Sequence, residues 1–142
     1  MDDARPLSER YWYVEGTTAT RIDVDAGDFW TQVMSDDPRD EIVRHVLGAD
    51  GWLVTEYRLD GTMTHEEMHP NGDELHVLVA GRYDLVLVHE AGETVIPMLP
   101  GTCANVARGV WHRFVVHEPT TAVSITAGRG TEHRPIPAQE NT

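Results

Sequence analysis

The feature that most constrains this chain is the stretch between Gly61 and Gly81, which concentrates metal-binding side chains as no other segment does. Its candidate ligands are His65, Glu67, His69, Glu74 and His76. A second cluster, residues 101–112, follows one hairpin later and ends in His112. Imidazole and carboxylate are the usual ligands of zinc, manganese and iron in proteins. Together the two clusters predict one metal pocket, built from two strand-turn-strand units.

Residues 65–69 also spell H-E-x-x-H, the zinc signature of metalloproteases. That chemistry requires a helix, because only there do residues four apart share a face. Pro70 directly follows His69 and biases it away from helical angles, and Asn71 and Gly72 predict a turn. The context therefore does not confirm a protease, and we interpret the segment as a strand that leads into a turn.

Side chains alternate between the two faces of a strand, so Glu67 and His69 point the same way. The turn over residues 70–73 then returns the chain, and Glu74 begins the next strand. This hairpin brings Glu67, His69 and Glu74 towards one point, where His112 can complete the set. We predict His69, Glu74 and His112 as metal ligands. Glu67 has three interpretations: a fourth ligand, a general base beside the ion, or a surface glutamate.

The same alternation predicts which other side chains line the cavity. His76 shares the face of Glu74, Phe114 shares the face of His112, and Trp52 lies on the strand before the first cluster. We expect His76, Phe114 and Trp52 to contact substrate, with ordinary core packing as the alternative. His65 is expected either to be exposed or to lie just behind the metal ligands. The remaining histidines are expected at the surface: His45, His89, His117 and His133.

Turn signals separate many short apolar runs over residues 52–127, a pattern typical of an all-β sandwich or barrel. The predicted strands are 52–59, 74–79, 83–88, 94–99, 103–106, 111–116 and 122–127. Upstream, Asp28 is a plausible N-cap of a short helix. Residues 39–47 fit either a helix or the start of a strand.

Composition limits the classes of protein that remain. At 142 residues we expect one domain: an N-terminal arm and short helix over 1–50, a barrel over 51–128 and a polar C-terminal tail over 129–142. A net charge of −13 argues against nucleic acid as a partner. No apolar run approaches the ~20 residues of a membrane span, and the N-terminus has no secretory signal, so we expect a cytoplasmic protein. The sequence has no lysine for Schiff-base chemistry, and its one cysteine, Cys103, is expected to be buried.

The two clusters resemble the motifs of the cupin family. The first motif, G-x5-H-x-H-x(3,4)-E-x6-G, places Glu67, His69 and Glu74 at its ligand positions. The positions of the second, G-x5-P-x-G-x2-H-x3-N, are occupied by Gly101, Ala107, Gly109, His112 and Val116. The resemblance covers about residues 52–127. In three places the chain departs from it: Glu67 replaces the first metal histidine, Ala107 the proline and Val116 the asparagine.

The resemblance implies a single cupin-type antiparallel β-barrel (a jelly roll) with a short N-terminal helix, extended termini and a homodimeric assembly. It implies a divalent ion, iron, manganese or zinc, held by His69, Glu74 and His112, with Glu67 as ligand or base. The implied function is a metal-dependent enzyme that acts on a small organic substrate, foremost an oxidoreductase of the dioxygenase kind, with isomerase and lyase chemistry also found in the family. The alternative is a non-catalytic cupin that binds or senses a small ligand.

Overall fold

The computed structural model describes residues 3–61 and 63–137. Over these residues it has nine strands, joined in one antiparallel sheet, and two short helices, which confirms the predicted all-β class. The elements are β1 (Trp12–Glu15), β2 (Thr18–Arg21), α1 (Ala26–Val33), α2 (Glu41–Gly48), β3 (Trp52–Leu59), β4 (His65–Met68), β5 (Glu74–His89), β6 (Gly92–Met98), β7 (Cys103–Val106), β8 (Trp111–Thr126) and β9 (Glu132–Pro135).

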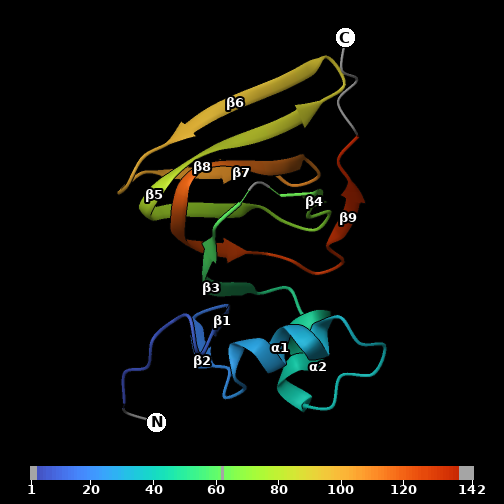
Figure 1. The fold of residues 1–142 in the computed structure, drawn as a ribbon. Coiled ribbons are helices and arrows are strands. Elements are labelled where there is room, and N and C mark those ends of the chain that lie inside the picture. The colour runs from blue at the N-terminus through green and yellow to red at the C-terminus, as the bar shows by residue number, and fades with distance from the viewer. Residues whose placement is uncertain (1–2, 62, 138–142) are drawn as a thin grey trace.

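The sheet curls as in a jelly roll, but its pairing does not close it into a complete barrel. One path of paired strands runs β2-β1-β3-β8-β4-β9, and β5 pairs with β6, β7 and β8. In Figure 1 the long strands occupy one half of the molecule, while α1, α2, β1 and β2 gather beyond β3 at the other end. We call this second group, residues 11–49, the N-terminal cap.

Two strands are longer than the sequence predicts. Residues 74–79 and 83–88 belong to one strand, β5, and residues 111–116 and 122–126 belong to β8. β5 is irregular where the sequence predicts a break, because its register against β8 shifts between Leu78 and Tyr83. Gly81 lies in this bend at a φ of +87°, and a Cβ there would lie 2.1 Å from the carbonyl oxygen of Pro119. Only glycine tolerates both conditions, so the strand bends here rather than ends.

The segment of the cap whose sequence fits either a helix or a strand is a helix. Residues 41–48 form α2, which buries Val43 and Val46. Helix α1 begins three residues earlier than predicted, because Asp25 rather than Asp28 is its N-cap and accepts a hydrogen bond from the Gly27 amide. Asp28 instead lies in the first turn of α1, where a negative charge favours the helix dipole.

The apolar side chains form two cores. The barrel core contains Leu78, Tyr83, Leu85, Met98, Val106, Phe114 and Ala122. The cap core contains Tyr11, Tyr13, Ile22, Phe29, Val43 and Val46. The aromatic residues near the N-terminus therefore pack within their own chain.

Two smaller expectations need correction. Cys103 is exposed rather than buried. Within the C-terminal segment, residues 132–135 form β9 and pair with β4, so this segment adds a strand to the sheet. Among the described residues, no helix is long and apolar enough to cross a membrane.

Candidate metal centre

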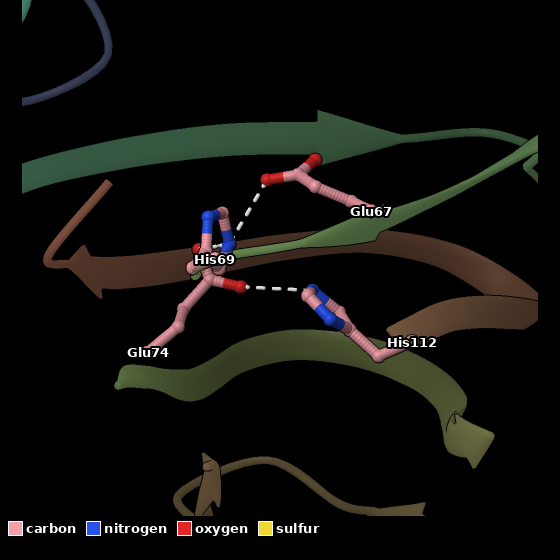
Figure 2. Close-up of side chains that lie close together, drawn as sticks. All are labelled: Glu67, His69, Glu74 and His112. Carbon is pink, nitrogen blue, oxygen red and sulfur yellow. Dashed lines mark hydrogen bonds and ion pairs between the residues drawn. The ribbon is translucent and has the colours of Figure 1, made fainter. Parts of the chain in front are cut away.

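Four side chains from three strands and one turn converge on a point inside the sheet. Glu67 lies on β4, His69 directly follows it, Glu74 is the first residue of β5 and His112 the second of β8. Each offers a ligand atom, and these atoms all lie within 4.8 Å of one another. Figure 2 shows the four side chains turned towards a common centre. This is the set that the spacing of the two motifs predicts, and we call it the metal-ligand group.

The distances within the group are short. The Nε2 atom of His69 lies 3.0 Å from Glu67 Oε1 and 3.1 Å from Glu74 Oε2. The Nε2 atom of His112 lies 3.1 Å from Glu74 Oε1. His69, Glu74 and His112 are buried, whereas the side chain of Glu67 is 27% exposed. Three members are thus shielded from water, and the fourth borders the space into which the group opens.

The second nitrogen of each imidazole fixes which nitrogen faces the centre. The Thr131 hydroxyl donates to the Gly128 carbonyl, so at 2.8 Å it accepts a hydrogen bond from His69 Nδ1. In the same way, His112 Nδ1 donates to the Val110 carbonyl at 3.2 Å. When the rings are neutral, both Nε2 lone pairs therefore point at carboxylates. Partners of this kind orient the histidine ligands of metal sites.

The charges and pKa shifts within the metal-ligand group favour a bound cation. Burial lowers the pKa of His69, but its close contacts with Glu67 and Glu74 outweigh burial and raise that pKa to about 9. Burial raises the pKa of Glu74, but the charge of His76 and the bonds from the surrounding histidines hold it well below its usual range. His69 Nε2 is buried without a hydrogen bond. A divalent ion would satisfy this nitrogen and both carboxylates together, so the residues fit a metal.

Residues outside the motif positions also contact the metal-ligand group. The Thr126 hydroxyl donates a short hydrogen bond to Glu74 Oε2. On the other side of Glu74, His76 Nε2 approaches Oε1 at 2.5 Å, while His76 Nδ1 bonds the Tyr57 hydroxyl at 3.0 Å. Phe114 packs edge-on against His76 with ring centroids 4.9 Å apart. His76 and Phe114 therefore lie where strand alternation places them, and Tyr57 joins them unpredicted.

His133 also differs from its expected place at the surface. It lies on β9 directly opposite Glu67, and its Nε2 is 3.5 Å from Glu67 Oε2. The ring is about half exposed, yet it lines the same cavity as the metal-ligand group. The signal that could have found it is the alternation of His133 with Thr131 across a short extended run, which is weak on its own.

The structure does not place Trp52 in the cavity. Its side chain lies with those of Val54 and Glu56 on the opposite face of β3, and it is one of the large exposed hydrophobic residues. The inward face of β3 instead carries Leu53, Thr55, Tyr57 and Leu59. Alternation defines two faces of a strand but does not say which one is inward, so the expectation that Trp52 contacts a ligand in this cavity is wrong.

The H-E-x-x-H segment is a strand, as its context predicts. His65 is exposed, and Glu66 is buried on the face away from the metal-ligand group. Glu66 accepts hydrogen bonds from Arg113 at 3.0 Å and from Arg134 at 2.8 Å. Its carboxylate is therefore occupied in holding β8 and β9 to β4, and metalloprotease geometry is absent from this segment.

Comparison with solved structures finds cupin-domain proteins. A mutant oxalate decarboxylase from Bacillus subtilis matches with a TM-score of 0.51 at 15% identity, covering 60% of this chain and 24% of that chain. A cupin superfamily protein from Desulfitobacterium hafniense matches with a TM-score of 0.47 at 16% identity, covering 55% of this chain and 68% of that one. Hydroquinone 1,2-dioxygenase from a Sphingomonas species gives 0.43 at 16%, covering 53% and 59%.

No family model matches the chain, and no curated protein matches its sequence. The chain spans about a quarter of the length of the oxalate decarboxylase structure that it matches. At these identities the likeness establishes the fold and leaves the activity open. The chain has the cupin fold, with a group of four side chains that could hold a metal ion.

Proposed function

We propose that this protein is a metal-dependent cupin enzyme that acts on a small organic substrate, with oxidation by dioxygen as its reaction class. One observation carries the proposal. Two imidazoles and two carboxylates surround one point, and the Nε2 atom of His69 is buried there without a hydrogen bond. Such a group is costly to bury unless a cation joins it, and it borders a cavity of ligand size.

The ligand set favours a divalent ion of intermediate hardness. Two imidazoles and two carboxylates suit manganese, iron and zinc, and two anionic ligands neutralise the charge of such an ion. When bound, the ion would supply Lewis-acid polarisation of a substrate oxygen and, for iron or manganese, redox chemistry with dioxygen.

The residues around the ion have separate roles as metal ligands and as proton acceptor. His69, Glu74 and His112 hold the ion in a buried site. Glu67 directs Oε1 towards the group and Oε2 towards His133. We assign Oε1 as a fourth ligand atom and Oε2 as the acceptor of a substrate proton. The half-exposed His133 can then pass that proton to solvent.

The cavity wall positions the substrate. His76 and Phe114 form an aromatic wall beside Glu74, and Tyr57 holds the His76 ring from behind. Their closeness to the metal-ligand group makes His76 and Phe114 the proposed substrate contacts.

The test is elemental analysis of untagged protein produced without added metal, followed by oxygen uptake with a panel of phenolic and enolic substrates. We expect close to one divalent ion per chain and oxygen uptake that requires it. A folded protein that binds no manganese, iron or zinc would contradict the proposal.

A second candidate is a cupin that binds a small ligand without turnover. The observation that favours it is the large apolar share of the cavity, which binding alone would explain. Incubating the metal-loaded protein with a bound compound and recovering that compound unchanged, without oxygen uptake, would favour this candidate.

A further inference from the structure

The cavity that contains the metal-ligand group extends well beyond it. Its volume is about 590 Å³, within the range of small-molecule sites. One end is formed by the metal-ligand group. The other end is formed by α1 and α2 of the N-terminal cap. The cavity therefore borders both the metal-ligand group and the helices of the N-terminal cap.

The two ends differ in chemistry. The walls between them are the inward face of β3, with Leu53, Tyr57 and Leu59, and the ring of Phe114. The cap end is aromatic and aliphatic, with Phe29, Trp30, Val33, Met34 and Val46. Among the described residues that line the cavity, the only carboxylates are those of Glu67 and Glu74, and none is an arginine or a lysine. A charge on the ligand therefore finds a partner at the metal end and nowhere else.

Unsatisfied polar atoms mark both ends. Four buried side-chain atoms in the described part of the chain lack a hydrogen-bond partner, and three of them belong to residues that line this cavity. His69 Nε2 and His76 Nε2 are at the metal end, and the Tyr13 hydroxyl is at the cap end. Buried polar atoms without partners are rare in folded proteins. The two imidazole nitrogens lie against the carboxylates of Glu67 and Glu74, so the metal end is the polar end of the cavity.

We infer that the substrate is an elongated, mainly apolar molecule with a single anionic oxygen head, and that a dianion of the same length binds more weakly. The head lies against the metal-ligand group, and the apolar body runs along β3 to the cap. This inference rests on the proposed function, because the head is placed by the ion.

The entrance follows from the same lining. Trp30, Met34 and Leu47 line the cavity, yet they are 44%, 77% and 38% exposed. Side chains that border both the cavity and bulk water form its rim. An apolar rim on the cap admits the apolar part of a ligand without desolvating a charge, whereas a second carboxylate drawn into the cavity would be buried without a partner.

The experiment is calorimetric titration of the manganese-loaded protein with butanoate, hexanoate, octanoate and decanoate, together with decanedioate. Decanedioate matches decanoate in length and differs by a second carboxylate. We expect Kd to fall about threefold for each added methylene. We expect decanedioate to bind at least about tenfold more weakly than decanoate. Equal affinities along the series, or a tighter dianion, would overturn the inference.

Rim variants locate the binding. Leu47→Glu and the more exposed Met34→Glu should weaken decanoate binding at least about tenfold and leave butanoate nearly unchanged. Leu99→Glu is the matched control, because Leu99 is exposed outside the cavity. Circular dichroism confirms that each variant is folded. If folded Met34→Glu protein binds decanoate as the native protein does, the tail does not reach the cap.

Displacement of the neutral dye 1-aminoanthracene by decanol separates this inference from the proposed function. A protein that holds one ion per chain but shows no dependence on chain length keeps the proposed function and loses the inference. A protein that holds no ion, yet binds decanol in a manner sensitive to Met34→Glu, loses the proposed function and the head assignment and keeps the apolar site.

Discussion

The two ends of the cavity are built by opposite means. At the metal end, Thr131 fixes the imidazole of His69 by a second hydrogen bond and Val110 fixes that of His112. Three of the ligands come from one short stretch of the chain, residues 67–74, and His112 comes from a distant strand. At the cap end, the walls come from two neighbouring helices held by aromatic and aliphatic packing. Directional bonds therefore position the metal-ligand group, whereas packing sets the shape of the cavity at the cap end. A mutation at one end should therefore leave the properties of the other end unchanged.

The largest expected change is a loss of stability caused by a substitution in the cap. Phe29 is only 1% exposed and packs edge-on against Tyr11, so Phe29→Ala should lower the free energy of unfolding by about 3–5 kcal/mol. Urea denaturation measures this. Metal stoichiometry of the folded variant should stay at one per chain. Val95→Ala, at an exposed position on β6, is the control and should change stability by less than about 0.5 kcal/mol. Loss of metal from folded Phe29→Ala would show that the two ends are not separable.

The opposite test removes a ligand from the metal end. His112→Ala should weaken metal binding by more than about a hundredfold while the sheet stays folded, since a ligand contributes more than the partners behind it. Competition with a chelating dye measures the affinity. His117→Ala is the matched control, because His117 pairs with Asp84 at the surface. Retention of tight binding by His112→Ala would remove this residue from the site.

A smaller effect is expected from the partner behind a ligand. Thr131→Val keeps the shape of the side chain but removes the acceptor for His69 Nδ1. Metal affinity should fall by about 10- to 100-fold, as is usual when such a partner is lost. Thr94→Val, at an exposed position on β6, should have no effect. An unchanged affinity in Thr131→Val would mean that packing alone orients His69.

Protons should leave the site when the ion enters. The pKa of His69 is raised to about 9, so at pH 7.5 the metal-free protein holds a proton there that a metal ligand must release. Calorimetry in buffers of different ionisation enthalpy should show release of about one proton per ion. The release should decline as the pH rises above 9. Binding without proton release at pH 7.5 would contradict the assignment of His69 as a ligand.

The subtlest change is at the residue that departs from the cupin motif. Glu67→His should retain one ion per chain but shift the preference towards zinc and away from manganese, because an imidazole replaces a carboxylate. Competition between the two metals measures the shift. If preference, affinity and activity all stay unchanged, Glu67 lies outside the site.

The sequence predicts the metal end better than the cap end, for a physical reason. Strand alternation and short turns fix the relative directions of Glu67, His69 and Glu74, so local spacing is enough to bring them together. Strand β3 has the predicted bounds because Gly51 and the pair Asp60-Gly61 delimit it.

What the sequence could not supply is contacts between distant segments. Thr131 contacts His69 from a distant part of the chain, and Tyr57 contacts His76 from β3. No sequence motif predicts either contact. Which face of β3 is inward depends on the segments that pack over it. Local spacing alone therefore places Trp52 on the wrong face. The cap was ambiguous because its apolar spacing fits a helix or a strand until packing decides.

The most direct test of the central claim is an anomalous difference map from crystals of the untagged, manganese-loaded protein, collected where manganese scatters anomalously. We expect one strong peak per chain, within bonding distance of His69 Nε2, His112 Nε2 and the carboxylates of Glu74 and Glu67. A map without a peak among these four residues, or with a peak only elsewhere, would contradict it.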